Sequence, residues 1–489
     1  MLRNLLFILS IVFLLPSYIF GQAANTVEFG KNRVQYHQKF NQWLQYDSEN
    51  FVTYWYGDSR NVGQFAVQMA EYDFNSIQKI LEHRISDKME IIVYTDLTDF
   101  KQSNIGNEAS FESSTGQTKI AGNKIFVYFD GNHQNLRKQI KEGIAEVFIN
   151  SILFGSNLQE MVQNAVMLNM PLWFKQGLIA YSGENWGVEE DNQLRDIILS
   201  KKYESFYELA EKNPKLAGHS FWHYIAKNYG NSAVPNLIYL ARINKSIGNG
   251  FMYVIGTSYE SIIDSWWVDN VERYNGEVEG MTKFEAYKKI LHFNKKTLPI
   301  TRFEINPRKN IVAYTYNDIG KWRVVLEDTK TGKKTTIIQK GYKNNIQATD
   351  FNYPIIAWKP NGEELSVIYE QRDIIKFYTY NITTKKEKFD KFSPEFQRVF
   401  DANYIDNNDM VISAATKGFS DLFIYKTKTT QNERLTNDIY DDLEPRIVNI
   451  SGKKGILFLS NRTDNELKSN KLDTILPIGK MDVFYYDLD

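Results

Sequence analysis

The feature that most constrains the fold is a repeated β-strand pattern in the C-terminal part of the chain. From Leu298 to the end, apolar and aromatic runs alternate with polar hairpins and Thr/Lys-rich turns, at intervals of about fifty residues or less. The units begin near Asn306, Ile355, Asn403 and Asn449. This period indicates a repeat architecture, so residues 298–489 are expected to form an all-β, partial or small β-propeller of about four blades. An irregular β-sandwich is the alternative that the same pattern allows.

Three short segments resemble the propeller of the periplasmic Tol system. Trp358–Leu365 (WKPNGEEL) is similar to its W-S-P-D-G-x-x-I turn, Leu435–Pro445 (LTNDIYDDLEP) to its L-T-x-x-x-x-D-x-x-P turn, and Phe458–Arg462 (FLSNR) to F-x-S-x-R. In that family these segments supply turns and contacts between blades, so they imply no chemistry. The fourth unit stops at Asp489. Either the ring closes unusually, the chain is a fragment, or a partner covers the open edge.

A pair of helices, predicted at Leu136–Asn150 and Pro171–Tyr181, carries the second constraint. The first contains K-E-G-I-A, which has the layout of the zinc-peptidase sequence His-Glu-x-x-His with both histidines missing. The residues are Lys141, Glu142, Gly143, Ile144 and Ala145. The second helix, PLWFKQGLIA, resembles the gluzincin helix P-x-W-F-x-E-G-x-A, whose glutamate is the third zinc ligand. Gln176 stands at that position.

These identities remove the expected zinc chemistry. A catalytic zinc needs three protein ligands and an open position for water. Lys141 is a cation, Ala145 offers no donor and Gln176 keeps only an amide oxygen, so Glu142 has no metal-bound water to deprotonate. The resemblance implies a pseudo-peptidase with no metal and no cofactor. We predict that the Lys141 ammonium partly replaces the metal and points toward Gln176 or Glu142. Two ordinary amphipathic helices are the alternative.

The preceding segments fit a zincin-like lobe. Strands are expected at Phe51–Tyr56, Met89–Tyr94 and Lys124–Phe129, a helix at Val62–His83, and a loop or hairpin at Gly106–Gly122. The predicted organisation is α+β, with an inactive gluzincin-like domain at residues 22–274 and a linker at 275–297.

Further helices are predicted at Ser205–Ala210, Ser220–Tyr229, Val234–Ile243 and Tyr259–Val271. His219 and His223 have the spacing of a metal pair, so an unusual zinc peptidase is a second hypothesis. No glutamate follows the first histidine and no third ligand is marked, which favours two polar or capping histidines.

Net charge and cysteine content limit the partners and the cellular compartment that we expect. The chain has 489 residues, a net charge of −1 and no cysteine. The charge favours neither nucleic acid nor an anionic membrane surface, and the missing cysteine excludes disulfides, thiolate sites and a lipidated N-terminal cysteine. Residues 1–21 read as a cleaved signal peptide ending at Gly21, with an uncleaved anchor as the alternative. We therefore expect a periplasmic protein that is not integral to a membrane.

A gluzincin-like domain joined to a Tol-type propeller resembles periplasmic accessory proteins of the type IX secretion system. This resemblance implies a non-enzymatic protein that docks on the outer-membrane translocon and closes the periplasmic opening of its pore. A third hypothesis is a glycan- or peptidoglycan-binding module, suggested by Trp186, Trp266 and Trp267, although such aromatics are often core residues.

Overall fold

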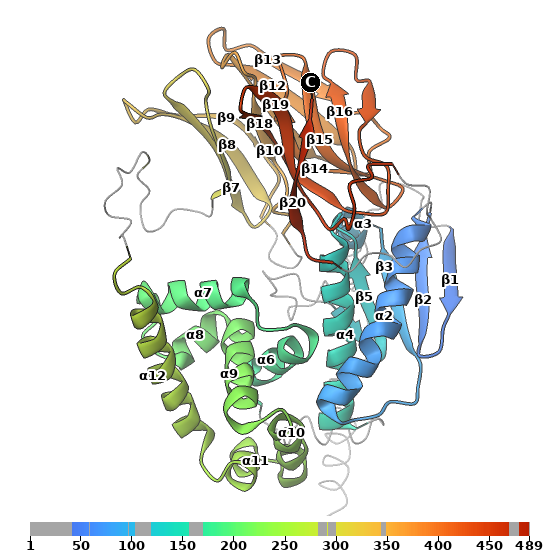
Figure 1. Ribbon diagram of the computed structural model, residues 1–489, viewed down its shortest axis with the longest axis vertical. Coiled ribbons are helices and arrows are strands. Elements are labelled where there is room, and N and C mark those ends of the chain that lie inside the picture. The colour runs from blue at the N-terminus through green and yellow to red at the C-terminus, as the bar shows by residue number, and fades with distance from the viewer. Residues whose placement is uncertain are drawn as a thin grey trace, which may run out of the picture.

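The structure is a computed structural model with an N-terminal part of sheet and helices and a C-terminal part made of small sheets (Figure 1). It describes residues 42–57, 59–95, 97–102, 119–155, 170–281, 291, 300–343, 349–468 and 479–488. The predicted signal peptide and most of the predicted linker lie outside these residues. Among the described helices, none combines the length and the apolar character that crossing a membrane requires.

The N-terminal part contains one five-stranded sheet in the order β1-β2-β3-β5-β4. The central strands β2, β3 and β5 are parallel, and the edge strands β1 and β4 run antiparallel to their neighbours. The predictions for β2 and β3 are confirmed to the residue, and β5 ends one residue earlier than expected. The predicted loop or hairpin at Gly106–Gly122 includes strand β4, which pairs antiparallel with β5, and residues 103–118 lie outside the described part of the chain. The strands are β1 (Trp43–Asp47), β2 (Phe51–Tyr56), β3 (Met89–Tyr94), β4 (Lys119–Ala121) and β5 (Lys124–Tyr128).

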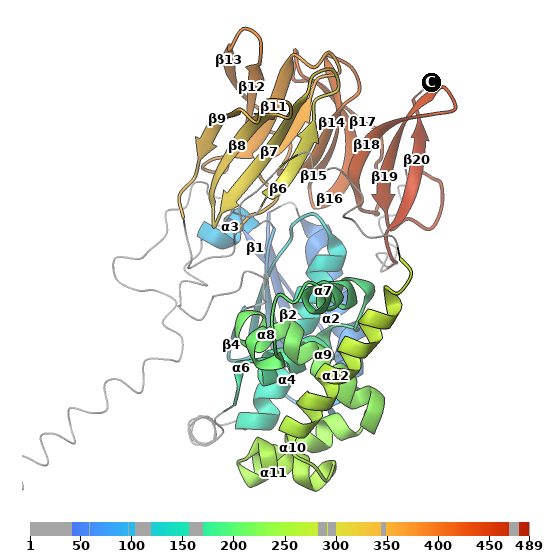
Figure 2. The same cartoon turned by 90° about the vertical axis from the view of Figure 1, so that its left-hand side faces the viewer.

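Two long helices, α2 (Arg60–Leu81) and α4 (His133–Phe154), pack against each other and against the sheet, while the short α3 (Leu97–Gln102) follows β3 (Figures 1 and 2). Their inward side chains join the sheet in one core, in which Phe65, Ile140 and Phe148 are fully buried. Asn132 caps α4 by accepting the backbone N–H groups of Gln134 and Asn135.

A group of further helices completes this part. The predicted helix Ser220–Tyr229 is wrong at its start, because α9 already begins at Pro214, where Asn213 caps it and proline suits the first turn. Helix α12 continues to Glu277, so it crosses the predicted boundary between domain and linker. The sequence analysis missed α7 and α11. The helices are α6 (Leu172–Gly183), α7 (Val188–Leu199), α8 (Phe206–Lys212), α9 (Pro214–Tyr229), α10 (Ala233–Asn244), α11 (Ile247–Val254) and α12 (Tyr259–Glu277).

Helices α6 and α9 approach unusually closely. A Cβ atom on Gly218 would lie 1.9 Å from the carbonyl oxygen of Trp173, and one on Gly177 would lie 2.2 Å from the Gly218 backbone. Only glycine fits at these two positions. The contact fixes where the side chains at the start of α9 lie relative to α6.

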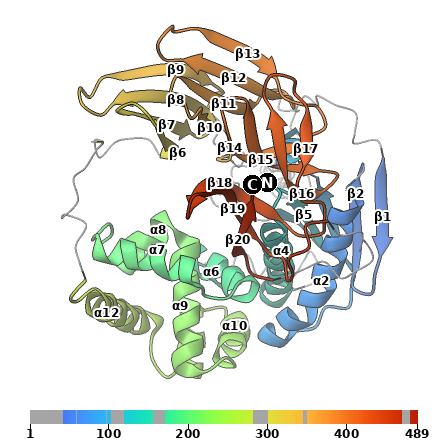
Figure 3. The ribbon, with the colours of Figure 1, turned by 45° about the horizontal axis from the view of Figure 1, so that its top comes forward.

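The C-terminal part contains four antiparallel sheets, three of four strands and one of three, arranged one after another in a propeller-like arc (Figure 3). The inner strands β6, β10, β14 and β18 contact in succession. The predicted repeat of β units is confirmed. The sheets are β6 (Ile300–Ile305), β7 (Ile311–Asp318), β8 (Lys321–Asp328), β9 (Lys334–Lys340); β10 (Ile355–Trp358), β11 (Glu364–Glu370), β12 (Ile375–Asn381), β13 (Glu387–Lys391); β14 (Arg398–Tyr404), β15 (Asp409–Thr416), β16 (Phe419–Lys426), β17 (Asn432–Arg434); and β18 (Asp442–Ile450), β19 (Lys453–Ser460), β20 (Asp482–Asp487).

Two of the Tol-like segments meet in the last sheet. Arg462 is fully buried, and its Nη2 atom lies 2.8 Å from both carboxylate oxygens of Asp442 and 3.3 Å from Asp438. Asp421, nearby, is paired with Arg434. These three aspartates are close enough together to suggest a cation site, but the two guanidinium groups already balance most of their charge. We therefore interpret the cluster of Asp421, Asp438 and Asp442 as a set of ion pairs that stabilises the fold.

The N-terminus of α4 joins the two parts of the molecule. The backbone N–H of His133 donates to Asp441 at 2.8 Å, and its Nδ1 atom lies 2.6 Å from the other oxygen of the same carboxylate, with both side chains buried. The Ser420 hydroxyl donates to the Gly131 carbonyl at 2.5 Å, and the Gln134 amide donates to the Gly479 carbonyl at 2.7 Å. Helix α4 is therefore anchored on the last two sheets.

Candidate functional site

The centre of the N-terminal part is built around Glu142, whose residue is only 4% exposed in the middle of α4. The end of α6 presses against it, because a Cβ atom on Gly183 would lie 2.9 Å from the Glu142 Cγ atom and 3.0 Å from its Cα atom. Glycine at position 183 thus allows the chain to turn there and to bring Glu184 beside Glu142.

A lysine from a third element completes this ionic centre, which we define as Glu142, Glu184 and Lys215. The Lys215 ammonium lies 2.5 Å from Oε1 of Glu142 and 2.7 Å from Oε1 of Glu184. Lys138, one turn before Glu142 on α4, lies 2.6 Å from the second oxygen of Glu184. Two carboxylates and one ammonium are thus gathered away from bulk water, with a second ammonium at the rim.

The pKa values of the two carboxyl groups are shifted in opposite directions. Burial, together with the hydrogen bond to Glu184, raises the pKa of Glu142 to about 8 despite the nearby Lys215 charge. Burial alone would also raise the pKa of Glu184, but its hydrogen bond with Glu142 and the charges of Lys215 and Lys138 outweigh burial and hold that pKa well below its ordinary value. Burial opposes the charge on Lys215, and the two carboxylates nevertheless raise its pKa. Near pH 7 a protonated Glu142, an ionised Glu184 and a charged Lys215 are therefore the expected states.

The other residues singled out from the sequence lie around this centre in different roles. Ala145 is fully buried in the core, and Gln176 is half-buried on α6. Lys141 is half-buried, and burial lowers its pKa. Lys175, next to Gln176, pairs with Glu146 of α4 at 2.9 Å. Lys215 contacts Glu142, and the role predicted for the Lys141 ammonium stays a prediction.

His219 and His223 follow Lys215 along the same side of α9. His219 is 2% exposed, its Nε2 atom has no hydrogen-bond partner, and burial lowers its pKa to about 4. Burial likewise lowers the pKa of His223. The indole of Trp186 packs edge-on against His219 at 5.1 Å and stacks on His223 at 5.7 Å between ring centroids. Within the described part of the chain, no third metal donor converges on these two imidazoles.

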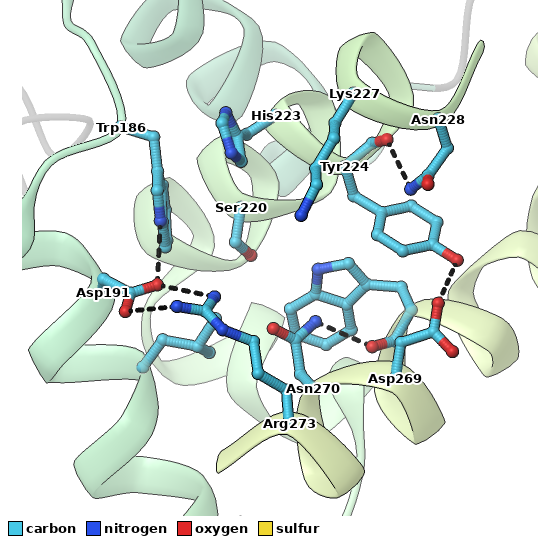
Figure 4. Close-up of a pocket in the computed structure, with 12 residues that line it drawn as sticks. Trp186, Asp191, Ser220, His223, Tyr224, Lys227, Asn228, Asp269, Asn270 and Arg273 are labelled. Carbon is cyan, nitrogen blue, oxygen red and sulfur yellow. Dashed lines mark hydrogen bonds and ion pairs between the residues drawn. The ribbon is translucent and has the colours of Figure 1, made fainter. Parts of the chain in front are cut away.

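Trp186 and His223 both line an open cavity of about 250 Å³ between α7, α9 and α12 (Figure 4). Asp191 holds one wall: it accepts the Trp186 indole N–H at 3.1 Å and two N–H groups of Arg273 at 3.0 and 2.9 Å. Across the cavity the Tyr224 hydroxyl donates to Asp269 at 2.7 Å. Of the three tryptophans singled out from the sequence, Trp266 is core and lines the cavity, while Trp186 and Trp267 are half-buried.

The sequence analysis missed Lys215 and Glu184. A signal for Lys215 was present, since Lys215, His219 and His223 recur every four residues and therefore share one helix side. Glu184 lies just past a helix end, where no periodic pattern marks it.

An N-terminal part of sheet and helices, followed by a four-blade propeller-like arc, is the class of architecture that these observations define. No protein-family model and no curated protein matches the chain. Among solved structures, it is similar to TolB from Acinetobacter baumannii, with 16% identity, 39% of this chain and 41% of that chain covered, and a TM-score of 0.29. It is also similar to a putative TolB from Agrobacterium tumefaciens, with 15% identity, 38% of this chain and 65% of that chain covered, and a TM-score of 0.27. Similarity to the tricorn protease is 17% in sequence identity, with 35% of this chain and 16% of that chain covered and a TM-score of 0.24. The chain spans less than two thirds of each of these proteins.

We expect Lys215→Met to destabilise the fold, because it removes the cation that the two buried carboxyl groups share and leaves only Lys138 beside Glu184. Breaking a buried pair costs about 3–5 kcal/mol, and protonation of Glu142 reduces that loss. Chemical denaturation measures it. The double variant Lys215→Met/Glu142→Gln should recover part of the loss, and the control Lys212→Met, an exposed lysine, should leave stability within about 0.5 kcal/mol. Equal effects of Lys215→Met and Lys212→Met would contradict the assignment.

Stability should also depend on pH through Glu142. Its pKa is raised from 4.5 to about 8 on folding, so the stabilisation is complete below pH 4.5 and is lost as pH rises toward 8, with a slope of up to about 1.4 kcal/mol per pH unit. Glu142→Gln removes this titration, so the variant should gain stability relative to the natural chain between pH 5 and 8, as measured by urea denaturation. Parallel pH profiles for the two chains would refute the shift.

Proposed function

We propose that this protein is a non-enzymatic periplasmic protein, with an inactive gluzincin-like domain and a partial β-propeller, that docks on an outer-membrane protein complex. The mixed sheet with an antiparallel edge strand, and the neighbouring helices α4 and α6, support the gluzincin-like part of this proposal. The partner that we propose from the sequence resemblance is the type IX secretion translocon, whose periplasmic opening the protein would close.

The observation that carries the proposal is the Lys215 ammonium at 2.5 Å from Glu142. In an active peptidase of this class the glutamate faces a metal-bound water. Here the Lys215 ammonium contacts the Glu142 side chain, and its positive charge would repel a divalent cation placed beside it. Lys141, Ala145 and Gln176 add no anionic or imidazole donor, so the donor set does not fit zinc.

Docking is supported by the outer surface of α10 and α11. These two helices pack together and expose four large side chains, which we call the α10–α11 surface. Tyr239 and Tyr253 are 56% and 71% exposed, and Ile243 and Met252 are more than half exposed. Exposed aromatic residues and methionine on neighbouring helices are typical of protein interfaces.

The absence of a zinc site is tested by reversing the substitutions. The natural chain, incubated with zinc and desalted, should retain well below one zinc per molecule by elemental analysis. The variant Lys141→His/Ala145→His/Gln176→Glu/Lys215→Met should retain about one zinc, since it restores three ligands and removes the blocking charge. Stoichiometric zinc in the natural chain would overturn the proposal, and no zinc in the variant would count against the gluzincin resemblance.

Docking is tested with the full chain and purified type IX translocon. We expect saturable binding, weakened about tenfold or more by Tyr253→Asp, because a charge would be buried in the interface. Val188→Asp is the matched control, since Val188 is 78% exposed on α7, away from this surface. No binding of the natural chain to the translocon would reject this partner.

A further inference from the structure

We infer that the cavity between α7, α9 and α12 is a binding site for a neutral saccharide, about one sugar ring in size. The inference does not rest on the proposed docking function, because the cavity uses none of the residues of the ionic centre or of the α10–α11 surface. Its volume, about 250 Å³, falls below the roughly 300–1,000 Å³ of cavities that hold drug-sized ligands. A single ring is therefore the matching size.

The wall of the cavity is aromatic and held in place. Trp186, Tyr224 and Trp266 all line it. The indole of Trp186 is fixed by its bond to Asp191, which in turn accepts the Tyr274 hydroxyl at 2.9 Å and the paired N–H groups of Arg273. A pyranose ring has an apolar C–H face that packs on aromatic side chains, which combine an apolar body with a polar tip. Because the wall is fixed before a ligand arrives, little ordering is required on binding.

Polar groups with unused hydrogen-bonding capacity line the rest of the cavity. Asn270 donates its amide N–H to the Trp266 carbonyl at 2.7 Å, which leaves its side-chain oxygen as an acceptor. The Ser220 hydroxyl donates to the Ala217 carbonyl at 2.8 Å, which leaves its lone pairs. Lys227 lines the cavity and has no ion pair to a described residue. Figure 4 shows the Lys227 ammonium and the Asn270 amide directed toward the same space. Sugar hydroxyls, which both donate and accept, match this mixture.

The charges of the lining favour a neutral ligand. Asp191 and Asp269 balance Lys227 and Arg273, and His223 is neutral near pH 7 because burial lowers its pKa. A charged ligand would leave one charge without compensation, and a purely apolar ligand would leave the polar groups unpaired. The aromatic wall, the polar rim and the balanced charge together point to a neutral sugar.

Tryptophan fluorescence of the full chain tests this site, with N-acetylglucosamine and glucose as probes and glucuronate as the charged comparison. We expect a saturable change with at least one neutral sugar and a Kd of about 1 mM. Lys227→Ala and Asn270→Ala should each raise that Kd about fivefold, the effect of losing one hydrogen bond. Lys79→Ala, an exposed lysine on α2, is the control and should leave the Kd unchanged.

Three results would overturn the inference. These are no saturation with either neutral sugar, an unchanged Kd in both cavity variants, or saturation with glucuronate alone. Because Lys227 is exposed and has no ion pair within the described part of the chain, Lys227→Ala should fold like the natural chain, which thermal unfolding checks. Failure of sugar binding would leave the translocon experiment unaffected, so the two proposals are tested separately.

Discussion

The ion pairs of Lys215 with Glu142 and Glu184 are the interaction on which the N-terminal part depends. They join three separate elements, the middle of α4, the end of α6 and the start of α9. Charges that are taken out of water must be paired where they lie. The pairing is possible only because Gly183 lets the chain press against Glu142, and because Gly177 and Gly218 let α6 and α9 approach. Backbone packing and charge balance therefore specify the same arrangement of helices.

Helix α4 extends this constraint to the propeller-like part. His133, at its start, is bound to Asp441, and Glu142 lies nine residues further on, about 14 Å along the axis. Between them, Arg137 makes two hydrogen bonds, of 2.8 and 2.7 Å, to Asp73 of α2. One helix thus carries buried polar contacts to the last sheets, to its neighbouring helix and to the ionic centre. A change in the orientation of either part relative to α4 would break at least one of them.

Strong local patterns made much of the fold predictable. β2, β3 and α4 carry enough buried apolar residues for their sequence alone to mark them, and the blades carry a repeat. The edge strand β4 has only three residues, and every residue of β1 is exposed, so no alternation of buried and exposed residues marks either strand. The ionic centre was harder to predict, because Lys215 and Glu142 are 73 residues apart in the sequence. They come together where glycines allow close approach of the backbone. Similarity to the peptidase helix pointed to Lys141. The four-residue spacing of Lys215, His219 and His223 was the sequence pattern that marked the lysine found beside Glu142.

Helix α9 explains why one region can hold both a closed ionic centre and an open cavity. Lys215, His219, His223 and Lys227 follow one another at four-residue spacing, and exposure increases from the buried His219 to the exposed Lys227. The indole of Trp186 packs against both imidazoles, His219 and His223, which lie between Lys215 and Lys227 along α9. On the buried side the Lys215 ammonium pairs with Glu142 and Glu184. On the open side the same helix presents the Lys227 ammonium, which has no ion pair to a described residue, and the lone pairs of the Ser220 hydroxyl, and such groups are available to a ligand.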